Sequence, residues 1–376
     1  MNPQEVEQLR DRFPVTRNWI YMNHAAVSPL SSDMASAMTR RVEELAADGA
    51  VHYRRWMDDV EHCRRMYARL LAARPQEVTF LDSTAEGVNR VANGLRWKDG
   101  DNVVTVDVEY PANVYPWWNL KEVGVQTRMV HNRQGRVEPK DLYDAMDSRT
   151  RVLALSFVEF SNGFRSDLAA IGAECRRRGV LFFVDAIQDL GALRMDVNEM
   201  HIDFLAAHSR KWLLCPGGKG AFFVRDDVLD RLRVTSVGAG SVVNATDYLD
   251  YDLTFVTGAR RFEGGGDSPV AFAATRAMLA LFTEVGTERV EEQVLALTDY
   301  LCERLSGAGF KLDTYRGPGE KSGIATFYRP TRPSIELSQR LEHGKVVHTH
   351  RYQRIRLSPH FYNTEDEIDE VLKILG

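Results

Sequence analysis

The chain has 376 residues, a length typical of two domains or of one large domain with a smaller partner. Its composition, 44% hydrophobic and 27% charged, is that of an ordinary globular protein, which does not favour a disordered or fibrous chain. The net charge is −5 and no basic tract is dense enough to track a phosphate backbone, so no nucleic-acid partner is expected.

Cysteine content and hydropathy argue against a disulfide-rich, metal-binding or membrane-spanning protein. The four cysteines are scattered, at positions 63, 175, 215 and 302, without C-x-x-C spacing. We therefore expect neither a disulfide framework nor a metal site, and we expect a cytoplasmic location. The N-terminus is polar and no stretch approaches the roughly 20 apolar residues of a membrane span, so no membrane association is expected.

The first part of the chain predicts a short helix over residues 3–12 and a long helix over residues 32–72. Between them, a short apolar run at residues 19–22 ends in Asn23 and His24, beside small residues. This pattern indicates either a backbone that passes close to a ligand or a simple loop.

A strand at residues 77–81 leads into a hydroxyl-rich turn, with a helix continuing over residues 88–95. The turn contains Ser83, Thr84 and Ala85. A strand, a turn and a helix N-terminus in this order can cradle a phosphate through backbone N–H groups and hydroxyl donors. Simple capping of the helix is the alternative interpretation.

From residue 77 to residue 224, apolar strands alternate with helices, which predicts an α/β fold with a mostly parallel sheet. Polar groups follow several of the strands: Tyr110, Asn162, the pair Asp185 and Gln188, and the run His208, Ser209, Arg210, Lys211. Open α/β sheets bind ligands at the carboxyl ends of their strands, so these side chains are candidate site residues.

After a glycine-rich segment at residues 260–269, two helices are expected over residues 270–284 and 289–308. Strands and helices then alternate to the end of the chain. We predict a large domain over residues 21–257, a smaller α/β domain over residues 258–376, and an N-terminal segment, residues 1–20, that packs on the small domain.

Asp185 and Lys211 together indicate one chemistry. A lysine can form a Schiff base with a carbonyl cofactor, and a carboxylate can keep the pyridinium nitrogen of that cofactor protonated. Either residue alone has an ordinary interpretation, because an Asp after a strand often caps a helix and a Lys there is usually solvated. Tyr110 can stack on a flat cofactor or be a core aromatic.

Seven motifs in order give the chain a family resemblance. They are STAEGVNRVANGL at 83–95, EYPANVYPW at 109–117, SNG at 161–163, VDAIQ at 184–188, SRKWL at 209–213, RRFEGG at 260–265 and SPHFYNTEDEID at 358–369. With these motifs the chain resembles the class V aminotransferase family of fold type I pyridoxal 5'-phosphate (PLP) enzymes. The resemblance covers nearly the whole chain and is nearest to the branch of cysteine desulfurases and isopenicillin N epimerase-like proteins.

The resemblance implies a role for each matching residue. Lys211 would form the internal aldimine and move the Cα proton, and Asp185 would hold the pyridinium nitrogen. Arg356 would bind the substrate α-carboxylate. The cofactor would also be held by a larger set: Ser83, Thr84, Ala85, Tyr110, Asn162, Gln188, His208 and Arg210. Asn23, His24, His350 and Arg351 are further candidates for substrate binding, the last two on a loop before Arg356.

The sequence departs from the family pattern at several places, one of them Arg210, where the residue before the lysine is commonly His. Desulfurases carry a nucleophilic cysteine in the loop before the last arginine, and here residues 348–354 contain none. We therefore do not expect a persulfide-forming desulfurase. The threonine that usually follows RFE-x-G and reaches the phosphate of a neighbouring subunit is Gly266 here.

These residues predict an enzyme acting on an α-amino acid or a cysteine conjugate through a Lys211 aldimine and Cα deprotonation. C–S β-elimination (lyase) or transamination are the favoured outcomes, with epimerisation third and an oxidative outcome open. A catalytically silent PLP-fold scaffold is the alternative from another class. The family also implies a homodimer with sites at the subunit interface.

Overall fold

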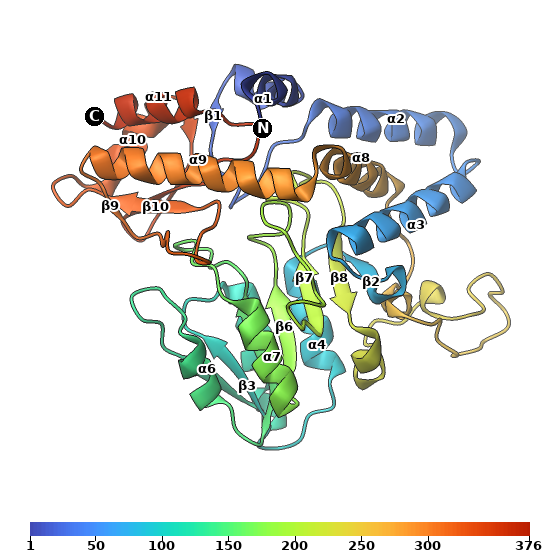
Figure 1. Ribbon diagram of the computed structural model, residues 1–376. Helices are drawn as coiled ribbons and strands as arrows, with labels where there is room; N and C mark the ends of the chain where they lie inside the picture. Colours follow the sequence, from blue (N-terminus) through green and yellow to red (C-terminus); the bar gives the residue numbers. More distant parts are fainter.

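The computed structural model describes residues 1–376, and a seven-stranded sheet forms its centre (Figure 1). Only β8 runs antiparallel to the other strands, so the predicted α/β fold with a mostly parallel sheet is confirmed. The strands, in their spatial order, are β2 (Val78–Leu81), β8 (Gly220–Val224), β7 (Phe204–Ala207), β6 (Leu181–Asp185), β5 (Thr150–Ser156), β3 (Asn102–Val106) and β4 (Gln126–Val130).

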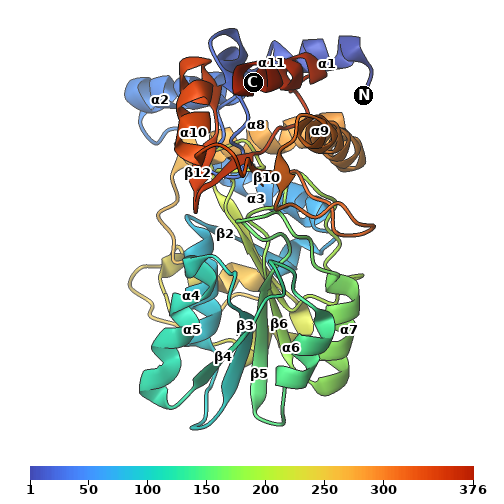
Figure 2. The same cartoon turned by 90° about the vertical axis from the view of Figure 1, so that its left-hand side faces the viewer.

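Helices cover both faces of this sheet (Figure 2). Alternate residues of a strand point to opposite faces, so Phe182 and Val184 of β6 join one hydrophobic cluster while Leu181 and Phe183 join another. The first cluster includes apolar residues of α6 (Pro139–Ala145) and α7 (Leu168–Arg178), and the second those of α4 (Thr84–Gly94) and α5 (Tyr115–Asn119). Burial on both faces explains why these strands are apolar throughout.

A second, four-stranded antiparallel sheet lies beside the first and has its own hydrophobic cluster (Figure 1). Its spatial order is β12 (Thr349–Arg351), β13 (Arg354–Leu357), β10 (Ala325–Tyr328) and β9 (Lys311–Leu312). Three helices pack on it: α9 (Thr287–Gly307), α10 (Ser334–His343) and α11 (Glu365–Leu375).

The N-terminal residues contact the C-terminal part of the chain. Strand β1 (Ile20–Tyr21) pairs with β11 (Val346–Val347), and Arg10 at the end of α1 (Pro3–Arg10) forms an ion pair of 2.7 Å with Glu367. The proposed division into three segments stays a prediction, because packing contacts alone do not define independent folding units.

The prediction of one long helix over residues 32–72 is wrong about its continuity. Two helices occur there, α2 (Ser32–Asp48) and α3 (Tyr53–Leu70), with Gly49 as the C-cap of the first. Both pack on α8 (Pro269–Val285), and the change of direction between them allows both to reach it. No single helix is long and apolar enough to cross a membrane; α8 and α9, bent by 80°, meet the length and composition test only as a pair.

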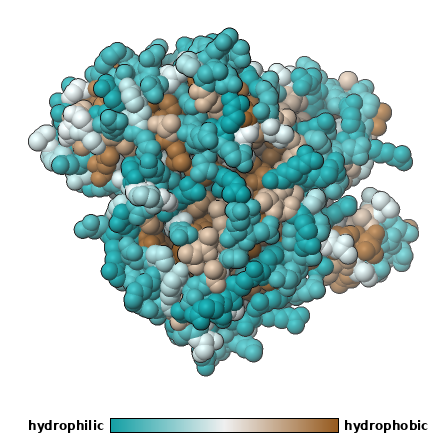
Figure 3. Space-filling model, in the orientation of Figure 1, coloured by the Kyte–Doolittle hydropathy of each residue, from teal (hydrophilic) through white to brown (hydrophobic).

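An irregular arm, residues 237–257, projects from the large-sheet part of the molecule (Figure 1). The arm exposes six large apolar side chains: Val237, Val243, Tyr248, Leu249, Tyr251 and Leu253. Apolar atoms are visible on this lobe in Figure 3. A concentration of this kind is typical of an interaction surface.

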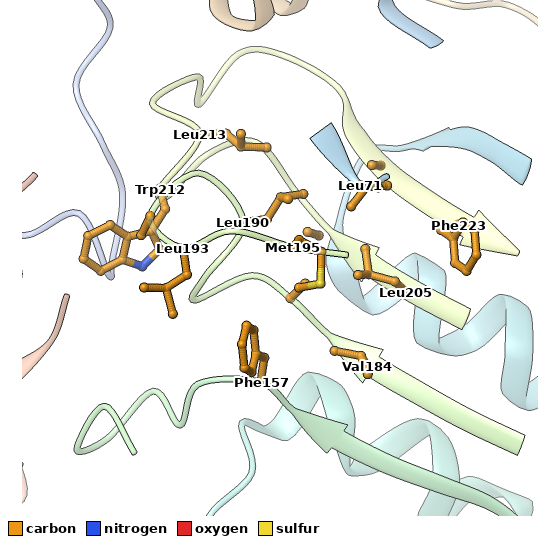
Figure 4. Packing of buried hydrophobic residues seen from close by; sticks show 14 of the residues in the cluster. Leu71, Phe157, Val184, Leu190, Leu193, Met195, Leu205, Trp212, Leu213 and Phe223 are labelled. Atoms are coloured by element: carbon orange, nitrogen blue, oxygen red, sulfur yellow. The ribbon is translucent and has the colours of Figure 1, made fainter. Parts of the chain in front are cut away.

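The turn after β6 and the loop after β7 pack against each other through apolar side chains (Figure 4). Leu190, Leu193, Trp212 and Leu213 are all buried in the same cluster. Gly191, at φ +101°, lies so close that a Cβ atom there would come within 2.4 Å of the Trp212 carbonyl oxygen. The position of the residue next to Lys211 therefore depends on a glycine in the neighbouring turn.

We expect Gly191→Ala to destabilise the protein by about 3 kcal/mol, because backbone strain and a steric clash add together. Gly179→Ala is the matched control: Gly179 has φ +70°, but a Cβ atom there meets nothing within 4 Å. The free energy of unfolding of Gly179→Ala should fall by only about 1 kcal/mol. Urea unfolding of both variants measures the difference, and equal losses would contradict the packing argument.

Candidate active site

Asp185 and Lys211 come together at the carboxyl ends of two neighbouring strands. Asp185 is the last residue of β6, and its Cα pairs in register with Ala206 of β7. Lys211 follows β7 after three further residues, and both side chains are buried, with 1% and 7% of their surfaces exposed. The Lys211 Nζ atom lies 5.5 Å from the centre of the Tyr110 ring. The three residues thus surround one small volume.

Burial moves both pKa values toward neutrality. It lowers the pKa of Lys211 to about 7, with the Asp185 charge opposing and nearby arginines assisting. It raises the pKa of Asp185 to about 6, which the Ile187 N–H and the Lys211 charge oppose. A lysine that readily loses its proton is a good nucleophile and base near neutral pH.

One oxygen of Asp185 is unsatisfied. The Oδ1 atom accepts a hydrogen bond of 2.9 Å from the Ile187 N–H, and the buried Oδ2 atom has no partner. Buried polar atoms rarely lack partners, and such an exception often marks a ligand position. A protonated ring nitrogen would satisfy this oxygen, so the residues present fit a pyridinium cofactor.

The N-terminus of α4 provides a candidate anion site. Ser83 caps the helix through Glu86, and the Thr84 hydroxyl accepts a hydrogen bond of 3.2 Å from the His208 N–H. The capping interpretation is confirmed for Ser83, and the phosphate cradle stays a prediction. The first N–H groups of any helix, here including that of Ala85, lack helical partners and are available to an anion. Arg210 lies two residues after His208. Its backbone N–H donates a hydrogen bond of 3.1 Å to the Nδ1 atom of His208.

His208 is a neutral donor or stacking group in this environment. Burial, and then the Arg210 charge, lower the pKa of His208 to about 4. A positive charge near the turn comes instead from Lys219, which the sequence analysis missed. Its Nζ atom lies 2.7 Å from Asp82 and 3.4 Å from Asp267. The glycine-rich sequence around Lys219 was the available signal.

Arg356 lies on β13 and faces a cavity of about 660 Å³. The side chain is 6% exposed and donates hydrogen bonds to the Phe160 carbonyl oxygen and, at 3.4 Å, to the Thr349 hydroxyl. Its buried Nε atom has no partner. Burial, with the Arg351 charge, lowers the pKa of Arg356 to about 10. An unpaired buried guanidinium is suited to bind a carboxylate.

Gln188 and Asn162 are near the site, but their amide groups are engaged with the protein. Gln188 donates to the Ala25 carbonyl oxygen and accepts from the Trp212 indole N–H. Asn162 donates to the Gly135 carbonyl oxygen and accepts from the Phe164 N–H. Their expected contacts with the cofactor stay predictions.

Asn23 and His24 hold the framework around the site. Asn23 donates to the His348 carbonyl oxygen and accepts a hydrogen bond of 2.7 Å from the Thr349 hydroxyl. His24 is fully buried, and its nitrogens bond to the Ser358 carbonyl oxygen and the Tyr362 hydroxyl. With both nitrogens engaged, His24 is placed to support the fold rather than to touch a substrate, and the same holds for the Asn23 amide.

The loop expected before Arg356 is a strand, β12, and its regular alternation separates two candidates. Arg351 lines the cavity, whereas His350 points away and its Nε2 atom lies 2.9 Å from the Ser334 hydroxyl of α10. Adjacent residues of a strand face opposite sides, so the expected contact of His350 with the substrate is not supported.

Sequence analysis also missed Glu109, a fully buried carboxyl group between β3 and β5. It accepts hydrogen bonds from the Ser156 N–H and hydroxyl, and Ser156 pairs in register with Asp185. Burial and then the Asp185 charge raise the pKa of Glu109 to about 8. Its place after β3, like the other polar groups at strand ends, was the signal.

Comparison with known proteins identifies the family. Residues 20–371 match the class-V aminotransferase family, and the chain belongs to it. Members of this family depend on PLP, which is the cofactor of this enzyme. The orphaned oxygen of Asp185 and the partly neutral Lys211 suit that cofactor.

Curated relatives and solved structures agree with this family. A probable cysteine desulfurase of Methanothermobacter thermautotrophicus is 28% identical over 96% of this chain and 95% of its own length. An uncharacterised aminotransferase of Bacillus subtilis, YcbU, is 28% identical over 97% of each chain.

Two solved structures share the fold. An apo cysteine desulfurase from Thermococcus onnurineus has a TM-score of 0.88 at 22% identity, covering 100% of this chain and 97% of its own. The cystine C–S lyase C-DES, in complex with cysteine persulfide, has a TM-score of 0.88 at 23% identity, covering 96% and 98%. At these identities the likeness establishes the fold alone.

Glu109→Gln should reduce the pH dependence of stability in the cofactor-free protein. Between the ordinary value of 4.5 and about 8, the unfolded chain releases the Glu109 proton while the folded chain keeps it. The free energy of unfolding should therefore fall as pH rises through this window, and the neutral amide removes that contribution.

Urea unfolding at about pH 5 and about pH 8 measures the effect. We expect the wild type to lose at least about 1 kcal/mol more than Glu109→Gln over this interval. Glu303→Gln, at an exposed position of α9, should behave as the wild type does. A wild-type loss matched by Glu109→Gln would show that Glu109 ionises normally.

Proposed function

We propose that this PLP enzyme is a C–S lyase that removes the sulfur substituent of a cysteine conjugate by β-elimination. The observation that carries the proposal is the buried Lys211 beside Asp185, together with an unpaired Arg356 and the lack of an accessible thiol. Sulfur chemistry on cysteine is also what the names of several relatives describe.

Each of the chain's own residues has a defined task in this proposal. Arg356 binds the α-carboxylate with its guanidinium fork, which fixes the Cα atom relative to Lys211. Lys211, with its lowered pKa, accepts the Cα proton at Nζ. With the cofactor bound, Tyr110 would stack on its ring, and Asp185 would keep the ring nitrogen protonated.

When bound, PLP supplies an electron sink for the pair released from the Cα–H bond. That pair would form a Cα=Cβ double bond as the Cβ–S bond breaks, and the sulfur would leave with the Cβ–S pair as a thiolate. The remaining three-carbon fragment is released and hydrolysed to pyruvate and ammonia. No external oxidant or reductant is required.

A persulfide-forming desulfurase fits this chain less well, although relatives carry that name. Such an enzyme needs a reactive cysteine thiolate within reach of the substrate. The four cysteines are all buried, and burial raises the pKa of each thiol, to about 12 for Cys175 and Cys215 and about 11 for Cys302.

Transamination is the second candidate, since one relative is named an aminotransferase. The same Lys211 would then return the proton to the cofactor carbon instead of expelling a β-substituent. We also propose a homodimer, supported by the exposed apolar side chains of the arm at residues 237–257. The cytoplasmic location stays a prediction from cysteine usage.

Product analysis of the cofactor-loaded enzyme tests the reaction. We expect pyruvate and a free thiol in equal amounts from S-substituted cysteines, without added keto acid. Amine transfer that requires a keto acid, with no pyruvate from the conjugates, would contradict the lyase and favour the aminotransferase. Lack of both activities with no bound cofactor would favour a silent scaffold.

Lys211→Ala should remove the covalent attachment of the cofactor. After borohydride reduction, the wild-type protein should keep one cofactor through denaturation, with the adduct on the Lys211 peptide in mass spectra, because the reduced bond no longer hydrolyses. Lys121→Ala, at an exposed lysine, should keep the adduct as the wild type does. An adduct on a different lysine in the wild type would refute the assignment.

A further inference from the structure

The cavity beside Arg356 has room for far more than the three-carbon part of a cysteine substrate. Its volume of about 660 Å³ falls within the roughly 300–1,000 Å³ of pockets for drug-sized ligands. The lining comes from both sheets' loops and strands, including Phe160, Asn162, Tyr315 and Thr326, and it does not include Lys211 or Asp185. The cavity therefore does not enclose the reacting atoms, but it adjoins them, because Arg356 and Arg351 in its lining act electrostatically on Lys211.

One face of the β12–β13 hairpin provides the charge of this cavity. In the antiparallel register Thr349 pairs with Arg356 and Arg351 pairs with Arg354, so these four side chains share a face. All four line the cavity. Tyr352 and Gln353 close the hairpin at φ +50° and +57°, the two-residue turn type that fixes register most tightly.

The charges of this face are not balanced within the protein. Arg354 is satisfied, because it pairs with Asp313 and its guanidinium lies 3.8 Å from the centre of the Tyr328 ring. The Arg351 side chain is exposed at the rim of the cavity and has no ion pair or hydrogen bond within the protein, whereas the buried Arg356 bonds only to neutral oxygens. Asp313 is the only carboxylate in the lining. Two cationic groups thus remain without an anion.

A substrate with one carboxylate can neutralise only one of them. We propose that Arg351 binds a second carboxylate, carried by the distal end of the sulfur substituent, so that the substrate is a dicarboxylic cysteine conjugate. The proposal rests on the proposed function, because it assumes that Arg356 takes the α-carboxylate. Pairing both guanidinium groups removes their mutual repulsion, and a neutral substituent leaves Arg351 unpaired.

Binding of two isosteric ligands to the cofactor-loaded Lys211→Ala variant, which lacks the proposed base and therefore leaves the ligands intact, tests this inference. S-(2-carboxyethyl)-L-cysteine carries the second carboxylate, and S-(2-carbamoylethyl)-L-cysteine replaces it with an amide of the same shape. Isothermal titration at low ionic strength should give the diacid an affinity about tenfold higher. Arg351→Met should reduce that preference to less than about twofold, measured as the ratio of the two affinities in the same variant.

Two control variants sharpen the result. Arg17→Met, at an exposed arginine without ion pairs, should keep the full preference for the diacid. Arg351→Lys, which keeps the charge but not the fork, should retain part of it. Equal affinities for the two ligands while Arg351 is present, or a preference that survives Arg351→Met, would overturn the inference.

The outcome is separable from that of the proposed reaction. A diacid preference that depends on Arg351, without pyruvate release from any conjugate, supports the subsite and refutes the lyase. Pyruvate release with no diacid preference supports the lyase and refutes the subsite. Binding of neither ligand, with no pyruvate, refutes both.

Discussion

The site depends on a lysine and a carboxylate buried together at the ends of two adjacent strands. Removing Lys211 and Asp185 from water raises the energy of each charged form, and their attraction only partly compensates. The result is an amine that loses its proton near neutral pH and a carboxyl oxygen left without a partner. Both features lower the stability of the cofactor-free fold. A bound cationic ring would compensate, because it would pair with the free carboxyl oxygen.

The rest of the molecule holds this costly pair in place. The hydrophobic clusters on both faces of the central sheet fix β6 and β7, and the packing of Gly191 against Trp212 fixes the loop that carries Lys211. The second sheet presents Arg356 to the same space from a separate cluster. The reacting groups therefore come from elements whose positions are set by different cores, which suits a substrate bound between them.

Electrostatics divides the site into two regions. Two carboxyl groups, Asp185 and the missed Glu109, lie on either side of Ser156 at the ends of the central strands, and the guanidinium groups of Arg351 and Arg356 line the neighbouring cavity. A zwitterionic ligand with additional negative charge matches this polarity. The pKa shifts are concentrated here because burial is their main cause, and the opposite charges of Asp185 and Lys211 only partly oppose it.

The sequence by itself determined the α/β class, the strands that carry Asp185 and Lys211, and the family, because apolar runs and local motifs depend on neighbouring residues. Only the tertiary structure decided four features. They are the helix break at Gly49, the orientation of His350 away from the cavity, the hydrogen bonds that occupy both nitrogens of His24, and the burial of Glu109 beside the site. Each depends on which side chains from distant segments face each other. Local patterns, such as the place of Glu109 after a strand, can mark a candidate, but register and packing decide which contacts form.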